Sequence, residues 1–153
     1  MQIDGGCFCR YITFEAEIDA ETIGVCHCTD CQILSGSPYR VVVLTTSGGF
    51  RLLSGTPTIY VRTAASGTKR AQAFCPKCGT PVWGSALVNP QIYNLRVGTI
   101  RQRASLQPRR QLWCVSEIEW AKDLSPITER FDRQPNVGTR VTSADSGGDP
   151  TMR

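Results

Sequence analysis

Residues 75–79 of the chain read Cys-Pro-Lys-Cys-Gly, a spacing that lets both sulfurs face one metal ion. The glycine accepts the positive φ that is often needed where the chain turns away from such a pair. A tetrahedral zinc site takes four ligands, so this segment supplies two and requires two more. A redox-active disulfide is the alternative for a Cys-x-x-Cys pair, but no βαβ pattern surrounds this one.

An upstream pair, Cys7 and Cys9, is the expected source of the missing ligands. In an extended strand, residues i and i+2 point to the same face, so both sulfurs can bind one ion. We therefore expect Cys7, Cys9, Cys75 and Cys78 to form a closed structural zinc site. Such a site joins the first strand to a distant turn, and its binding energy becomes folding energy.

A third group, Cys26, Cys28 and Cys31, provides only three thiolates. Three protein ligands with an open fourth position are typical of a reactive zinc, and a substrate thiol can occupy the vacancy. The alternative is that His27 or Cys114 closes the site and makes it structural. His27, the only histidine of the chain, is also a candidate proton carrier in catalysis. Cys114 is expected to be an ordinary buried cysteine.

The rest of the sequence predicts a mainly β domain with an antiparallel sheet. Residues 7–18 alternate between apolar and polar side chains, as a half-buried strand does. One helical turn is expected over residues 29–34, ended by Gly36 and Pro38. Five further runs are bounded by turn residues and are expected to be strands, namely residues 39–46, 58–63, 70–74, 81–87 and 92–100.

Domain organisation and compartment follow from composition. We expect one domain over residues 1–135 and a flexible C-terminal tail over residues 136–153, which is polar and without periodicity. The chain begins without the basic and apolar segments of a signal peptide, and no run reaches the roughly 18 apolar residues of a membrane span. These features predict a cytoplasmic protein without a membrane partner, in which a count of eight cysteines points to metal or redox chemistry rather than to a disulfide framework.

The net charge of +4 hides an uneven distribution, because no Asp or Glu lies between Cys31 and Ser116. Thiolates on two zinc ions would offset part of the positive charge of that region. The basic run over residues 101–110 has no interleaved aromatic side chains, so stacking platforms for nucleic acid are not evident and nucleic acid is not the expected partner. A solvated or metal-compensating face is the favoured interpretation of this region, and an anionic small ligand is the alternative. No feature selects an oligomeric state.

In order and spacing, the three cysteine groups resemble the glutathione-dependent formaldehyde-activating enzyme family, which also includes centromere protein V-type domains. The resemblance extends from Gly5 to about Pro135. It rests on residues 5–9, on residues 26–31 followed by Ser-Gly-Ser-Pro at 35–38, on residues 74–81, on Val-Gly-Thr-Ile at 97–100 and on residues 116–123.

The resemblance implies a β-tent fold with two zinc ions, a structural one on the four-cysteine set and a second on the three-cysteine set. It also implies a carbon–sulfur lyase that joins glutathione and formaldehyde reversibly as S-hydroxymethylglutathione, so a small thiol or thiol adduct would be its partner. Two positions depart from the family pattern. Arg10 stands where the family usually has glycine, and Gln111 stands where it usually has histidine, which leaves the substrate less defined than the metals.

Two other functions remain open at the level of sequence. One is a non-enzymatic structural zinc module that binds a protein or nucleic acid. The other is a redox sensor whose three-cysteine cluster loses its metal on oxidation. For the lyase, Arg40, Lys69 and Arg96 are conceivable partners of glutathione carboxylates, although no spacing argument selects among them.

Overall fold

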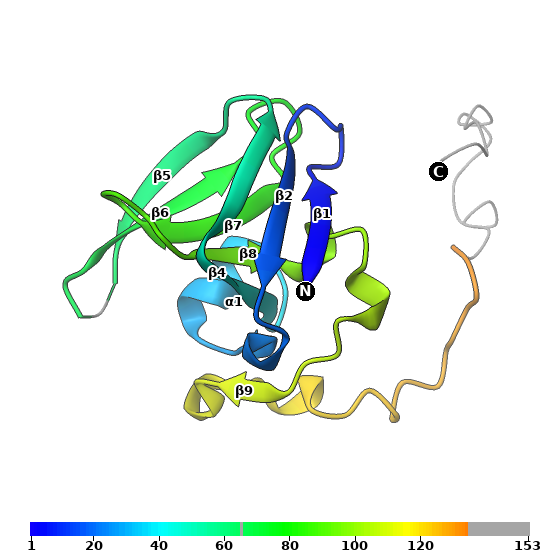
Figure 1. The fold of residues 1–153 in the computed structure, drawn as a ribbon. Helices are drawn as coiled ribbons and strands as arrows, with labels where there is room; N and C mark the ends of the chain where they lie inside the picture. Colours follow the sequence, from blue (N-terminus) through cyan, green and yellow to red (C-terminus); the bar gives the residue numbers. More distant parts are fainter. Residues whose placement is uncertain (65, 135–153) are drawn as a thin grey trace, which may run out of the picture. The chain divides into compact units, whose positions relative to one another are not determined.

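The computed structural model describes residues 1–64 and 66–134. The first compact unit, Met1–Lys122, is built on a mainly antiparallel β-sheet (Figure 1). The strands are β1 (Gln2–Gly6), β2 (Thr13–Ile18), β3 (Gly24–Cys26), β4 (Arg40–Ser54), β5 (Thr58–Thr63), β6 (Lys69–Phe74), β7 (Pro81–Ala86), β8 (Tyr93–Arg96) and β9 (Arg110–Leu112). The helices are α1 (Thr29–Ser35) and the short 3-10 turns Ala20–Thr22, Val97–Thr99, Arg103–Ser105, Cys114–Ser116 and Glu119–Ala121.

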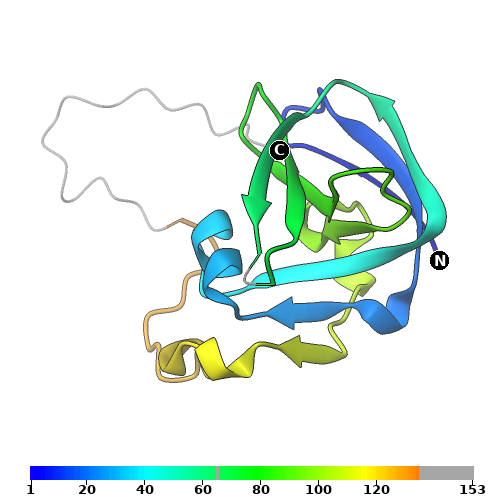
Figure 2. The same ribbon diagram turned by 90° about the vertical axis from the view of Figure 1, so that its left-hand side faces the viewer.

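The sheet order is β1-β2-β4-β8-β7-β6-β5, and β4 is the strand that joins its parts. Residues 50–54 of β4 pair with β2, whereas residues 40–44 pair with β3 and β8. The strand β3 also pairs with β9, in the one parallel pairing among the described strands. Figure 2 shows β4, β3 and β9 side by side, with α1 following β3 at one end of this layer.

The core forms where the strands bury alternate side chains. Phe14, Ala16 and Ile18 of β2 are almost fully buried, as the alternation of apolar residues predicts. Phe50 of β4 stacks on Tyr93 of β8 with ring centroids 4.2 Å apart. The same core includes two of the clustered cysteines, Cys7 and Cys75. The four-cysteine group therefore packs against the hydrophobic core of the sheet.

The predicted antiparallel, mainly β fold is confirmed, and so is the helix, which begins at Thr29 and ends at Ser35. Gly36 follows it in the left-handed conformation with φ of 62°. Three short strands, β1, β3 and β9, were not predicted, because strands of three to five residues contain too few alternations to be recognised. The strand expected over residues 92–100 ends at Arg96, and a 3-10 turn follows.

The strand predicted to start at Cys7 is wrong over its first half. Residues 7–12 form a tight turn, in which the Cys7 amide donates to the Ile12 carbonyl and the Arg10 amide donates to the Cys7 carbonyl, both at 3.0 Å. The strand β2 begins only at Thr13. A turn that brings two sulfurs to one ion cannot also continue a sheet ladder, which is why the alternation of residues 7–12 misleads.

A second compact unit begins at Asp123, whose carboxylate accepts hydrogen bonds from the Ser125 amide at 2.8 Å and the Ser125 hydroxyl at 2.7 Å. The predicted tail over residues 136–153 lies outside the described residues. Within the part of the chain that is described, no helix is long and apolar enough to cross a membrane.

Candidate metal centres and a charged pocket

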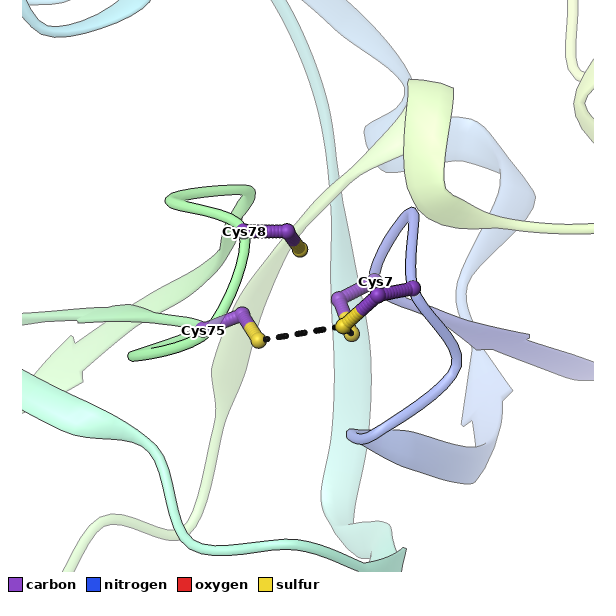
Figure 3. A group of neighbouring side chains, drawn as sticks. Cys7, Cys75 and Cys78 are labelled. Carbon is purple, nitrogen blue, oxygen red and sulfur yellow. Dashed lines mark hydrogen bonds between the residues drawn. The ribbon is translucent and has the colours of Figure 1, made fainter.

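Cys7, Cys9, Cys75 and Cys78 come together from two loops, one between β1 and β2 and one between β6 and β7 (Figure 3). All four sulfurs lie within 4.8 Å of one another. The Cys7 and Cys9 sulfurs are 3.6 Å apart, and the Cys9 and Cys75 sulfurs are 3.7 Å apart. Sulfurs held at about 2.3 Å around a tetrahedral zinc lie about 3.8 Å from each other. The donor set and its spacing therefore fit zinc.

Local hydrogen bonds hold these loops in shape. The Ile12 amide donates to the Cys7 sulfur at 3.2 Å, and the Gly79 amide donates to the Cys75 carbonyl at 2.9 Å. Thr80 links the two loops, because its hydroxyl lies 3.1 Å from the Cys78 sulfur and accepts from the Phe8 amide at 3.2 Å. The cluster is thus shaped by backbone that is already hydrogen-bonded.

Both loops need a left-handed residue. Gly79 has φ of 70°, as the sequence predicts, and Arg10 has φ of 63°. An L residue with a Cβ atom is strained in this region by about 1–2 kcal/mol, whereas glycine is not. The departure at Arg10 is therefore a matter of backbone conformation as well as of charge.

Electrostatics indicate that the four sulfurs cannot all be thiolates without a cation. The Thr80 hydroxyl lowers the pKa of Cys78 to about 5. A backbone hydrogen bond from Tyr11 lowers the pKa of Cys9, but burial and the Cys78 sulfur outweigh it and raise that pKa to about 11. One thiolate in the cluster thus disfavours another, and a divalent cation would remove this conflict.

The second cluster contains Cys26, Cys28 and Cys31, whose sulfurs also lie within 4.8 Å of one another. Cys26 ends β3, Cys28 is the N-cap of α1, and Cys31 lies in the first turn of the helix. The Cys26 and Cys28 sulfurs are 3.6 Å apart, and the Cys31 amide donates to the Cys28 sulfur at 3.4 Å. A short strand followed at once by a helix turn therefore brings all three sulfurs to one point.

Gln32 fixes the segment that carries this cluster. Its side-chain amide donates to the His27 carbonyl at 2.7 Å and to the Ser116 carbonyl at 2.8 Å. These bonds connect the loop between β3 and α1 to the segment after β9. The three cysteines are consequently held by the fold and do not depend on metal alone for their arrangement.

In this cluster, too, ionisation of one thiol disfavours ionisation of its neighbour. A hydrogen bond from the Cys31 thiol lowers the pKa of Cys26 to about 5, whereas the same interaction with Cys26 raises the pKa of Cys31. Three neighbouring thiolates need a cation, and a soft divalent ion such as zinc suits three sulfur donors. No fourth Cys, His, Asp or Glu joins the three sulfurs within the described residues.

His27 does not join this cluster. Neighbouring residues of an extended segment point to opposite faces, so the imidazole lies away from the Cys26 and Cys28 sulfurs. It lines a separate pocket of about 910 Å³, together with Gln111 and Glu117. Its Nε2 atom is 2.9 Å from the Gln111 amide oxygen and 3.7 Å from a Glu117 carboxylate oxygen, and its buried Nδ1 atom has no partner among the described residues. Gln111, one of the two departures noted from the sequence, is therefore the residue that contacts the His27 imidazole.

Cys114 was expected to be buried, and this is wrong: the residue is exposed. It begins a 3-10 turn directly after Trp113, which has φ of 61°. The turn directs this part of the chain to the surface, and Cys114 is not one of the clustered sulfurs. Neither of the two residues considered as a fourth ligand is therefore placed in the three-cysteine cluster.

A smaller pocket of about 110 Å³ adjoins the three-cysteine cluster, because Cys26 and Cys31 are part of its wall. Four arginines also line it, namely Arg40, Arg62, Arg70 and Arg96. Of the three basic residues considered from sequence, Arg40 and Arg96 reach this pocket and Lys69 does not line it. Arg62 and Arg70 were missed, and the only signal for them was the absence of acidic residues from the middle of the chain.

Two of these arginines are unusually buried. Arg40 is 7% exposed and Arg96 is 9% exposed. The Arg96 guanidinium donates to the Gln72 side-chain oxygen at 2.7 Å and to the Asn94 carbonyl at 3.2 Å. Burial, with a further contribution from the charge of Arg40, lowers the pKa of Arg96 to about 9, so it is still charged at neutral pH.

Comparisons with known proteins agree with this arrangement. A family profile described as glutathione-dependent formaldehyde-activating enzyme matches residues 2–116. A Schizosaccharomyces pombe protein described as an uncharacterized lyase is 28% identical over 82 residues, which are 54% of this chain and 56% of the relative. The match thus spans about half the length of that relative. A crystal structure of a Rhodobacter sphaeroides protein superposes with a TM-score of 0.54 at 18% identity, over 71% of this chain and 98% of that one.

Proposed function

Because the chain belongs to the glutathione-dependent formaldehyde-activating enzyme family, we propose that it is a zinc-dependent carbon–sulfur lyase acting on a thiol adduct such as S-hydroxymethylglutathione. The observation that carries this proposal is the three-cysteine cluster beside a pocket. The description of the S. pombe relative as a lyase supports the same class of reaction.

The two clusters have different roles in this proposal. The closed set of Cys7, Cys9, Cys75 and Cys78 would hold a structural zinc ion, which leaves no position for a substrate. Cys26, Cys28 and Cys31 would hold the second zinc ion and leave one position for a substrate sulfur. When bound there, zinc supplies Lewis-acid stabilisation of a thiolate at neutral pH.

The reaction adds a thiol across an aldehyde. The sulfur forms a bond to the carbonyl carbon, and the thiol proton ends on the former carbonyl oxygen; cleavage reverses both changes. Cys26 and Cys31 line the pocket and so border the space where the reacting sulfur would lie. Arg40 and its neighbours would orient an anionic part of the substrate. The buried walls would hold thiol and aldehyde next to each other, which lowers the entropic barrier to their reaction.

His27 is not assigned a catalytic role in this proposal. Its imidazole lines the larger pocket and bonds Gln111, and it is not part of the wall of the smaller pocket that Cys26 and Cys31 share. Its backbone carbonyl, in contrast, accepts from Gln32 and helps to shape the loop of the cluster. His27 therefore acts as a structural residue here.

The test is whether the protein accelerates the exchange between free glutathione and S-hydroxymethylglutathione in the presence of formaldehyde, followed by NMR exchange spectroscopy. The matched variants are Cys28→Ser, which removes one thiolate of the cluster, and Cys114→Ser, which removes an exposed thiol outside both clusters. We expect acceleration by the wild type and by Cys114→Ser, but not by Cys28→Ser. Equal exchange rates with all three proteins and with buffer would exclude the lyase activity for this substrate.

A further inference from the structure

The small pocket beside the three-cysteine cluster carries an excess of positive charge. Four arginines line it, and the one acidic residue in its wall is Asp30, which is paired with Arg62. Arginine is charged at all physiological pH values, so these four cations cannot be neutralised by losing protons. Negative charge in the pocket, or an anion that enters it, must therefore balance them.

The thiolates alone do not account for this excess. Three thiolates carry three negative charges, but with a divalent ion in the cluster their net charge is −1. The metal-bound cluster and Asp30 therefore offset two of the four arginine charges, and two remain. With a divalent ion in the cluster, compensation of the cysteines therefore does not account for all four arginines.

Several arginine donors in this pocket also lack partners. No hydrogen bond or ion pair joins the Arg40 guanidinium to a described residue, although Arg40 is only 7% exposed. The buried Nε atoms of Arg62 and Arg96 are likewise without an acceptor among described residues. A buried donor without an acceptor costs free energy, and arginine carries five donors and no acceptor. Such a pocket is suited to an anion with several oxygens.

The size of the pocket limits what that anion can be. A volume of about 110 Å³ is small beside the roughly 300–1,000 Å³ of pockets that enclose larger ligands. It has room for a carboxylate and a few adjoining atoms, but not for a whole tripeptide. Since Cys26 and Cys31 share its wall, a carboxylate bound there lies close to the reacting sulfur.

We propose that this pocket binds a carboxylate that lies within a few bonds of the carbon–sulfur bond that the protein makes or breaks. The inference rests on the proposed lyase function and narrows its substrate class to small acidic adducts. In the reaction R–SH + R′–CHO ⇌ R–S–CH(OH)–R′, the carboxylate belongs either to the thiol half or to the aldehyde half. Glutathione is larger than the pocket, so at most one of its carboxylates with a few adjoining atoms could enter it.

The test uses the zinc-loaded protein and isothermal titration calorimetry. Mercaptoacetate, which carries the carboxylate on the thiol half, is compared with neutral 2-mercaptoethanol. Glycolate, which has the shape of an acidic aldehyde half after addition, is compared with neutral ethylene glycol. The variants are Arg40→Gln and Arg70→Gln in the pocket and Arg103→Gln, an exposed arginine outside it, as control.

We expect at least one acid to bind both the wild type and Arg103→Gln at least about tenfold more tightly than its neutral counterpart does. The neutral compound lacks the carboxylate and so loses a charged hydrogen bond. The preference should fall below about threefold in Arg40→Gln and Arg70→Gln. Preference for mercaptoacetate alone assigns the carboxylate to the thiol half, and preference for glycolate assigns it to the aldehyde half. Two pocket variants are used so that misfolding of one does not decide the result.

Equal binding of acid and neutral compound in both pairs, or a preference that survives both pocket substitutions, would overturn the inference. This outcome is separable from failure of the lyase function. Exchange of glutathione and formaldehyde without any acid preference would leave the lyase and remove the carboxylate site. Acid preference without exchange for any thiol and aldehyde would leave the anion pocket and remove the lyase.

Discussion

Cys26 of β3 and Arg40 of β4 are register partners in adjacent antiparallel strands. This pairing sets an almost buried arginine beside the three-cysteine cluster, and the next pairing along, Val42 with Arg96, adds a second one from β8. The sheet register thus joins the candidate metal site to its charged pocket. We expect substitution of a cysteine of the cluster to remove the metal site, and substitution of an arginine of the pocket to weaken anion binding.

The four-cysteine cluster should control folding. Cys75→Ser or Cys78→Ser removes one of four ligands from a site that joins two loops, so we expect a loss of more than about 3 kcal/mol in the free energy of unfolding. Chemical denaturation with zinc analysis of the purified protein measures both effects. Cys114→Ser is the control and should be neutral. Soluble Cys78→Ser with two zinc ions and unchanged stability would show that these cysteines are wrongly grouped.

Arg10 should be a destabilising residue in its present conformation. Its φ of 63° favours glycine, so Arg10→Gly should stabilise the fold by about 0.5–1 kcal/mol after the greater unfolded-state entropy of glycine is counted. Arg103 has no positive φ, and Arg103→Gly should destabilise instead. Thermal unfolding of the two variants gives the comparison. Destabilisation by both substitutions would mean that the side chain of Arg10 contributes more than its backbone strain costs.

His27 should be dispensable for metal binding. Its imidazole bonds Gln111 and faces the larger pocket, so His27→Gln should retain the wild-type zinc content and lose about 1–2 kcal/mol of stability. Zinc content by mass spectrometry under native conditions and a denaturation curve measure the two quantities. A loss of one zinc ion in His27→Gln, with Cys31 intact, would place His27 among the ligands.

Zinc binding at the three-cysteine cluster should strengthen as pH rises. Cys26, with a pKa of about 5, is already a thiolate at neutral pH, whereas the raised pKa of Cys31 keeps that thiol protonated until metal displaces the proton. Because the metal-free form binds more protons, affinity falls as pH falls. Competition with a chromophoric chelator between about pH 6 and 8 should show a log affinity for the second zinc ion that rises with pH, as expected when metal displaces the proton of Cys31. A log affinity that does not change over this pH range would contradict this assignment.

Local features of the sequence predicted the two cysteine clusters well, because the spacing of the cysteines reflects short-range geometry. The structure places Cys26, Cys28 and Cys31 together as their spacing indicates. Cys7 and Cys9 also meet, although through a turn and not through the extended strand that was expected. The extended segment that leads from β3 to Cys28 explains why His27 points to the opposite face from Cys26 and Cys28.

The charged pocket could not be predicted, because it depends on contacts distant in sequence. Arg40, Arg62, Arg70 and Arg96 lie on four different strands, and the sheet order β4-β8-β7-β6-β5 sets them around one space. None of them has a neighbour in sequence that marks it as a binding residue. Their shared role is a property of sheet register.

The most direct test of the account is whether the three-cysteine site has an open coordination position. Cobalt is substituted for zinc, and the thiolate-to-cobalt absorption of the fully loaded protein is followed while glutathione or mercaptoacetate is added. Cys28→Ser, which should retain only the metal of the four-cysteine cluster, provides the baseline. We predict that the absorption of the wild type increases and saturates as a fourth sulfur enters, and that the variant does not respond. No response of the wild type to any small thiol would mean that the second site is closed, and would contradict the lyase function.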